Sequence, residues 1–241
     1  MQGHAQNQLP LLLSPAHPCP YLPQETARTA FLDAPATDHD PSYDELLARG
    51  FRRTGAYFYR PSCERCHACV PLRIPVKRFQ PDRSQRRAWR HNQDLEVRTL
   101  TARFVPDHFA LYARYLDWKH PNGGMQDSSP HDYANFLFGP KGVTQLTEMR
   151  LHGVLAAVAV LDRLENAFSA IYTFYAPELA RRSLGTFAIL WEIHEAQRHG
   201  LEWLYLGYWV AGSRKMTYKD SFRPYERLTV NGWKRVLGHP A

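Results

Sequence analysis

The sequence lacks the features that mark membrane-spanning, secreted or disordered chains. Its longest unbroken apolar run is Val154–Leu161, far short of the roughly 20 residues that cross a bilayer. The apolar stretch Leu9–Leu13 is too short for a secretory signal, and no Lys or Arg precedes Arg28. Aromatic residues make up 13% of the 241 residues, more than a disordered chain carries. We therefore expect a cytoplasmic protein with no membrane partner and a sizeable core.

Cysteine is also scarce, and all of it lies near the amino terminus as Cys19, Cys63, Cys66 and Cys69. Without a secretion signal we expect no disulfides. The last three are two residues apart, a spacing that lets successive thiolates turn toward one centre, and Cys19 could supply a fourth ligand. The set predicts an iron–sulfur cluster or zinc, with His67 as an alternative zinc ligand. Reduced cysteines without metal are the competing interpretation.

Acidic residues are few in one block of the chain. The net charge is +7, and residues 49–103 hold fourteen basic and four acidic side chains, a local balance of +10. Most of the basic residues are arginines, whose guanidinium groups bind phosphate oxygens in pairs. Phe79 and Trp89 lie among them, as in many surfaces that meet nucleic acid. A short basic helix over Ser84–His91 is therefore a candidate nucleic-acid contact, and a solvated basic face is the alternative.

The hydrophobic pattern predicts two parts, 1–103 and 104–241. In the first, residues 1–40 are irregular, Ser42 caps a short helix, and 70–76 is an extended edge segment because it holds two prolines. The second part begins with two helices and continues with a three-stranded meander, a helix, a strand and a last strand; the strands and the later helix span 143–150, 154–163, 167–175, 184–199, 203–206 and 227–230. This order is typical of a GNAT-like acyltransferase fold of the α/β (α+β) class, with a smaller cysteine-bearing amino-terminal part.

The turn before the helix at 184 bears on the acyl donor. An acetyl-coenzyme A loop needs Arg or Gln, two residues, Gly, one residue, and then Gly or Ala. Arg182 and Gly185 fit the first two positions, but Phe187 would crowd the pyrophosphate at the third. We therefore expect a donor other than coenzyme A and no bound coenzyme A.

Six segments together resemble the bacterial branch of the arginyl- and leucyl-tRNA–protein transferase family. They are spread in order over residues 19–226, nearly the whole chain. The segments are Cys19-Pro-Tyr-Leu, Phe58-Tyr-Arg-Pro-Ser-Cys63, Arg83-Ser-Gln-Arg-Arg, Arg182-Ser-Leu-Gly-Thr-Phe187, Tyr205-Leu-Gly-Tyr-Trp209 and Lys215-Met-Thr-Tyr-Lys219.

The resemblance implies an enzyme that moves leucine from leucyl-tRNA to proteins whose first residue is Asp or Glu, which marks them for degradation by the N-end rule. It also implies a cysteine-bearing amino-terminal part followed by a GNAT-like part, and arginyl relatives in eukaryotes are associated with an iron–sulfur cluster. One departure is that Val210–Ser213 has small residues where many relatives have a cysteine before the Lys-Met pair.

The implied reaction is the attack of an α-amine on an aminoacyl ester, so the site must hold the amine, accept a proton late and stabilise an oxyanion. The catalytic candidates are Tyr208, Lys219 and Asp220, with Glu192 also weighed as a proton acceptor. Candidates for binding the acidic acceptor are Arg73, which is preferred, and Lys119, His120, Arg214 and Lys215. Candidates for binding tRNA are Arg83, Arg86, Arg87, Arg90, Arg182 and Tyr218.

Two other functions fit parts of the pattern. One is a coenzyme A-dependent N-acetyltransferase, against which Phe187 and the basic block argue. The other is a non-enzymatic, metal-bearing nucleic-acid-binding module. The part of the chain after Phe104 is nearly neutral and has the apolar pattern of a folded core. A binding module of this kind would not need so large a second part.

Overall fold

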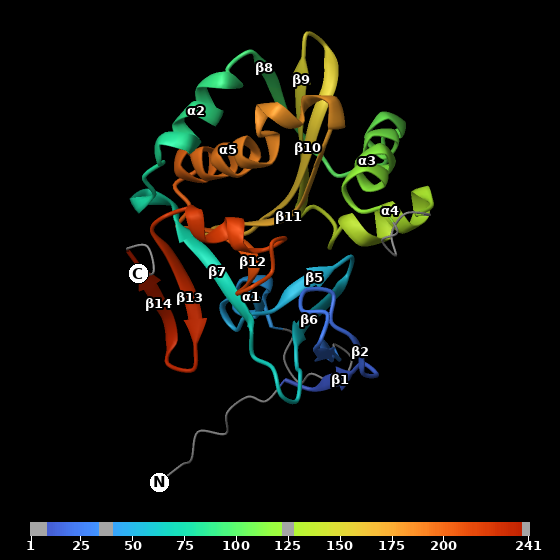
Figure 1. Ribbon diagram of the computed structural model, residues 1–241, viewed down its shortest axis with the longest axis vertical. Coiled ribbons are helices and arrows are strands. Elements are labelled where there is room, and N and C mark those ends of the chain that lie inside the picture. The colour runs from blue at the N-terminus through green and yellow to red at the C-terminus, as the bar shows by residue number, and fades with distance from the viewer. Residues whose placement is uncertain (1–8, 34–40, 122–127, 238–241) are drawn as a thin grey trace.

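The computed structural model describes residues 9–33, 41–121 and 128–237 and is built around an eight-stranded sheet (Figure 1). From one edge to the other its strands are β14 (Gly232–Val236), β13 (Tyr225–Thr229), β7 (Cys69–Pro75), β12 (Trp203–Val210), β11 (Ala167–Tyr175), β10 (Val154–Arg163), β9 (Thr144–Leu151) and β8 (Leu95–Thr101). Neighbouring strands are antiparallel except for β11 and β12, which are parallel. The predicted meander is confirmed as β9, β10 and β11.

Helices cover both faces of strands β8 to β11 (Figure 1). On one side lie α2 (Arg83–His91) and α5 (Leu184–Arg198), and on the other α3 (Pro106–Lys119) and α4 (Pro130–Leu137). The apolar residues of α5, such as Phe187, pack against Met149 of the sheet, while Tyr112 of α3 and Tyr133 of α4 fill the opposite face. Within the described residues, no helix is long and apolar enough to span a membrane.

A four-stranded sheet packs below the large one in Figure 1. Its strands run in the order β1 (Leu11–Leu13), β4 (Thr29–Leu32), β6 (Tyr57–Pro61) and β5 (Arg52–Thr54), and a two-stranded sheet of β2 (His17–Pro18) and β3 (Thr26–Ala27) is separate. Helix α1 (Tyr43–Ala48) starts at the predicted Ser42 cap. The expectation that residues 1–40 are irregular is wrong for its described part, because β1 and β4 pair with each other and β4 pairs with β6.

Two strand predictions need correction. Segment 70–76 was expected at an edge, yet β7 lies between β12 and β13. Its pairing with β13 covers only Leu72 and Arg73, so neither Pro71 nor Pro75 has to donate a hydrogen bond on that side. The predicted last strand, β13, is also not the last strand of the sheet, because β14 follows it and pairs with it.

Strands from both sides of the predicted boundary at residue 103 share the large sheet. Both β7 and β8 precede the boundary, and they pair with β12 and β9. The chain is therefore a mixed α/β protein whose large sheet is completed by strands from its first hundred residues. The division at 103 stays a prediction.

The parallel pairing of β11 with β12 is short. Only Ala167–Ser169 pair with Trp203–Tyr205, although both strands continue further. The register of β12 against β7 shifts between Tyr205 and Gly207, and Gly207 has a positive φ of 78°. The side chain of Arg52 lies where this pairing ends. The described residues also include the short 3-10 helices η2 (Val76–Arg78), η3 (Pro177–Arg182) and η4 (Thr217–Ser221).

Candidate functional site

Arg52 of β5 occupies the place where the pairing of β11 and β12 ends. Its Nη1 donates to Ser169 Oγ at 2.7 Å, and its Nη2 donates to the carbonyl oxygen of Ala170, the first residue of β11 beyond the pairing. A Cβ on Gly207 would lie 3.2 Å from Arg52 Nε. Glycine suits this position for two reasons: it adopts the positive φ without strain, and it leaves room for the guanidinium group.

Two buried ionisable groups lie near Arg52. Glu192 of α5 is 0% exposed, and neither of its carboxylate oxygens has a hydrogen-bond partner among the described residues. Burial raises the pKa of Glu192 to about 8, against a lowering effect of Arg52. Lys219 of η4 donates from Nζ to the carbonyl oxygen of Tyr208 at 2.8 Å. Burial, aided by the charge of Arg52, lowers the pKa of Lys219 to about 7.

The pKa values of both groups therefore lie closer to neutral pH than those of ordinary glutamates and lysines. Tyr218, the residue before Lys219, is 51% exposed, and the Lys219 ammonium lies 6.0 Å from the centre of its ring. The cluster of Arg52, Glu192, Tyr218 and Lys219, which we call the η4 centre, therefore combines proton-transfer groups with an exposed aromatic side chain.

The other two catalytic candidates lie next to this centre but differ in exposure. The hydroxyl of Tyr208 is buried and donates to the carbonyl oxygen of Gly50 at 2.8 Å. Burial raises the pKa of Tyr208 far above its usual range. Its contact joins β12 to the loop between α1 and β5. Asp220 follows Lys219 in η4 and is half-buried.

The structure brings together three of the predicted acceptor-binding cations. Burial lowers the pKa of His120, and the charges of Lys215 and Lys119 lower it further. Lys119 lies over the ring of Trp118 at 5.2 Å, and both Arg214 and Lys215 are exposed in the segment that leads into η4.

Arg73, the preferred acceptor clamp, lies elsewhere. Its guanidinium group is stacked 3.6 Å from the ring centre of Trp203 and 4.2 Å from that of Trp233. It also forms an ion pair with Glu226 at 2.9 Å. Because this charge is already neutralised within the protein, Arg73 is a poor candidate for binding an acidic ligand.

The basic residues of α2 form one exposed face. Gln85 and Ala88 are buried, while the side chains at spacings of three, four and seven residues point outward: Arg83, Arg86, Arg87 and Arg90. Gln85 donates from Nε2 to the carbonyl oxygen of Ser221 at 3.1 Å. The start of α2 therefore adjoins η4.

Arg182, the remaining tRNA-binding candidate, is engaged with the other end of α2. It donates to Asn92 Oδ1 at 3.0 Å and to the carbonyl oxygen of His91 at 2.7 Å, and it forms an ion pair with Asp94. These contacts hold the loop that follows α2. Among the nearby apolar side chains, Leu184, Phe187 and Leu206 are core residues, whereas Trp209 is only half-buried.

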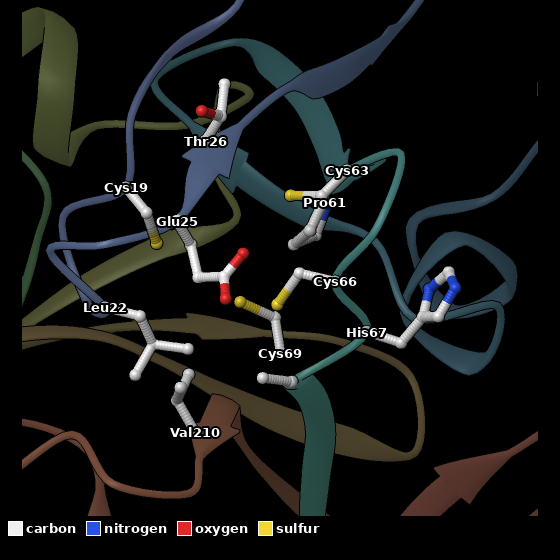
Figure 2. Close-up of a pocket in the computed structure, with 11 residues that line it drawn as sticks. Cys19, Leu22, Glu25, Thr26, Pro61, Cys63, Cys66, His67, Cys69 and Val210 are labelled. Carbon is white, nitrogen blue, oxygen red and sulfur yellow. The ribbon is translucent and has the colours of Figure 1, made fainter.

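The four cysteines line one small cavity of about 110 Å³ (Figure 2). Figure 2 shows their sulfur atoms and the Glu25 carboxylate turned inward, with His67 pointing away. Burial raises the pKa of the Cys69 thiol to about 12, and the other three cysteines add to this effect. Across the described residues, however, no group of three or more His, Cys, Asp or Glu side chains is arranged to hold a metal ion.

The sequence analysis did not predict that Arg52 is buried beside Glu192 and Lys219. It counted Arg52 and Arg53 in the basic block, yet the structure buries both. The available signal was two adjacent arginines inside a short strand, where one of them must face a protein interior. Glu192, which the sequence analysis weighed as a proton acceptor, carried a similar signal, because it lies between Trp191 and Ile193 in α5.

The chain is similar to known proteins over almost its whole length. Residues 17–87 match the family model "Arginine-tRNA-protein transferase, N terminus", and residues 107–229 match "Arginine-tRNA-protein transferase, C terminus". Proteins named aspartate/glutamate leucyltransferase are similar to it. The one from Nitrosococcus oceani is 48% identical, covering 92% of this chain and 93% of that protein. The one from Stenotrophomonas maltophilia strain R551-3 is 46% identical, covering 97% and 95%.

Solved structures are more distant. The structure of L-PGS from Bacillus licheniformis has a TM-score of 0.49 and 10% identity, covering 72% of this chain and 61% of that one. The crystal structure of FemX has a TM-score of 0.47 and 10% identity, covering 86% and 81%. The sequence matches, which include both halves of the family model, show that the chain belongs to the arginine-tRNA–protein transferase family.

Proposed function

We propose that this enzyme transfers leucine from leucyl-tRNA to the amino-terminal Asp or Glu of acceptor proteins, which marks them for degradation by the N-end rule. The observation that carries the proposal is the identity of 45 to 48% with proteins named aspartate/glutamate leucyltransferase, which extends over nine tenths of the chain. Because the donor is an aminoacyl-tRNA, we place the reaction in the cytoplasm.

The exposed face of α2 is proposed to bind the acceptor stem of the tRNA. Four exposed arginines on one face suit a phosphate backbone, because each can neutralise one phosphate group. Gln85 connects α2 to Ser221, so a tRNA bound along this helix has its 3′ end close to η4. There Tyr218, which is half exposed, is proposed to stack on the terminal base.

The η4 centre is the proposed place of reaction. The acceptor α-amine forms a bond to the carbonyl carbon of the leucyl ester and loses a proton. The bond from that carbon to the ribose oxygen then breaks, and the oxygen gains a proton. Lys219 has a pKa of about 7 and is proposed to accept the proton of the amine, with Asp220 beside it. An α-amine has a pKa near 8, so the transfer is nearly balanced in energy.

The remaining named residues are given supporting parts in this proposal. Tyr208 holds Lys219 through its carbonyl oxygen and fixes β12 through its hydroxyl, so it positions the centre. Lys119, His120, Arg214 and Lys215 attract the acidic acceptor. The order of helices and meander supports a GNAT-like fold whose donor is not coenzyme A, with the cysteine-bearing amino-terminal part attached below it.

The direct test uses leucyl-tRNA labelled in the leucine. The purified protein should label a peptide that begins with Asp and leave one that begins with Ala unlabelled. Arginyl-tRNA and acetyl-coenzyme A serve as alternative donors in parallel reactions. No leucine on the Asp peptide, or acetylation instead, would show the proposal to be wrong.

A further inference from the structure

Arg227 of β13 is half-buried and has no carboxylate partner among the described residues. Arg53 is paired with Asp162 and Arg73 with Glu226. Arg227 instead donates from Nη2 to the hydroxyl oxygen of Tyr225 at 2.6 Å. A half-buried guanidinium with only a neutral partner leaves a positive charge that a ligand can neutralise.

The position of Arg227 follows from strand alternation. Residues two apart on a strand point to the same face, so Tyr225 and Arg227 share one face of β13 while Glu226 points to the other. On that face the guanidinium of Arg227 lies 4.0 Å from the ring centre of Trp209 on β12. Stacking on a fixed indole ring holds the planar group in one orientation before any ligand arrives.

Two donors in this cluster lack acceptors. The Nε atom of Arg227 and the Nε1 atom of Trp209 are both buried and have no hydrogen-bond partner in the part of the chain that the structure describes. A buried donor left without an acceptor costs about 1 to 3 kcal/mol. A ligand with two adjacent acceptor oxygens would satisfy both.

The cluster lies beside the η4 centre. Trp209 directly follows Tyr208, whose carbonyl oxygen accepts the hydrogen bond of Lys219. Phe222, the residue after η4, packs in the same apolar cluster as Tyr225 and Trp209. A group held at Arg227 would therefore be a neighbour of the proposed reaction centre.

We infer that Arg227 and Trp209 form the subsite that binds the side-chain carboxylate of the acceptor's first residue. The inference rests on the proposed function and adds the residues that read the acceptor. A recessed guanidinium beside a neutral indole donor suits a carboxylate, whereas tRNA phosphates are better met by the exposed arginine row of α2. The exposed Lys119 and Lys215 attract any anion, but only fixed donors separate Asp from its neutral isostere Asn.

The test compares peptides that begin with Asp and with Asn, at saturating leucyl-tRNA. For the wild-type enzyme, kcat/KM is higher for the Asp peptide. In Arg227→Gln the ratio of the two values should fall about tenfold or more, while KM for leucyl-tRNA changes less than about twofold. Trp209→Phe keeps the ring and removes only the Nε1 donor, so the ratio should fall by a smaller factor of about three to ten.

Lys234→Met is the matched control. Lys234 is exposed on β14 and is the cross-strand partner of Arg227, so this variant removes a neighbouring charge without removing a buried donor. It should keep the Asp-to-Asn ratio of the wild type. Arg227→Lys retains charge without the planar donor pair and serves if Arg227→Gln fails to fold; its ratio should also fall.

The inference is wrong if the folded Arg227 variants keep the wild-type ratio, or if they raise KM for leucyl-tRNA and leave the ratio unchanged, which would assign the subsite to a phosphate. An equal loss of ratio in Lys234→Met would also overturn it, because general surface charge would then explain the selectivity. A wild-type enzyme that transfers no leucine to either peptide contradicts the proposed function itself, which is a distinct outcome.

Discussion

Arg53 of β5 and Asp162 of β10 form an ion pair in which both side chains are 0% exposed, with Nε and Oδ2 2.5 Å apart. The carboxylate also accepts hydrogen bonds from Thr144 Oγ1 at 2.7 Å and from the hydroxyl of Tyr43 at 2.6 Å. The pair thereby joins the small amino-terminal sheet and α1 to β10 of the large sheet.

Replacing Asp162 by Asn should destabilise the protein strongly. The guanidinium of Arg53 would remain buried without a counter-charge, which typically costs about 3 to 5 kcal/mol. Chemical denaturation followed by circular dichroism measures the free energy of unfolding. The control is Glu96→Gln, which breaks the exposed pair of Glu96 and Arg98 and should change stability by less than about 1 kcal/mol. Equal effects of the two variants would contradict the structural part given to Asp162.

Protonation of Lys219 should lower the activity of the enzyme at acidic pH. Wild-type kcat/KM should rise as the pH increases through about 7, because Lys219 then loses its proton and can accept one. Lys219→Met should lower kcat/KM by about 100-fold or more and lose this rise, keeping only the ionisation of the peptide amine near pH 8. Lys141→Met, at an exposed position, should behave as the wild type. A variant profile that still rises near pH 7 would remove Lys219 from the proton transfer.

Lys219 also affects folding, with a definite sign. Its folded pKa of about 7 lies below the ordinary value of 10.5, so between these limits the unfolded chain binds more protons. The free energy of unfolding contributed by this group therefore rises with pH from about 7 to 10.5 and is lost as the pH falls through 7. The difference in unfolding free energy between wild type and Lys219→Met, measured at pH 6.5 and 9, should shift in favour of the wild type at the higher pH.

Glu192 should act in the opposite direction. Its folded pKa of about 8 lies above the ordinary 4.5, so the folded protein binds the extra proton and the contribution of Glu192 to stability falls as the pH rises from about 4.5 to 8. Glu192→Gln cannot ionise and should gain roughly 2 to 4 kcal/mol relative to wild type between pH 5 and 8.5. Denaturation curves of both proteins at the two pH values give this difference. A constant difference would show that Glu192 ionises normally.

The exposed face of α2 should determine tRNA affinity. Arg86→Ala with Arg87→Ala should weaken the binding of leucyl-tRNA and reduce the slope of log K against log salt by roughly 1.5 to 2, because two phosphate contacts are lost. The control removes two exposed charges elsewhere, Lys141→Ala with Arg163→Ala. Filter binding at several salt concentrations measures both slopes. If the two double variants have the same slope, α2 is outside the tRNA interface.

The cysteine cavity carries a separate prediction. Protein purified without oxygen should contain iron with a visible absorption band, or zinc, and Cys19→Ser should lose it, because four thiolates provide a complete ligand set. Elemental analysis and absorption spectroscopy distinguish the two metals. Metal-free, colourless protein with four titratable thiols would contradict this prediction and favour reduced cysteines without metal.

Local sequence signals predicted the elements that depend on residues close together in the chain. Ser42 with Glu45 closes the predicted cap of α1, and the alternation between 143 and 175 gave the meander. The same signals misplaced β7, because Pro71 and Pro75 are typical of an edge and nothing local shows that β13 returns to pair with the two residues between them. Strand order depends on contacts between distant residues, which no short window contains.

The sequence by itself determined the composition of the chain, the cysteine spacing, the basic face of α2 and the family. Only the tertiary structure decided which charges are free to act. Arg73 and Arg227 are alike as residues on sheet strands, yet Glu226 neutralises Arg73, whereas Arg227 donates to the Tyr225 hydroxyl and has no carboxylate partner within the described part of the chain. Glu192 and Lys219 are ordinary ionisable residues in sequence, and burial moves both pKa values toward neutrality. The physical reason is that charge and proton affinity depend on the surrounding dielectric and partners, which are assembled from strands far apart in the chain.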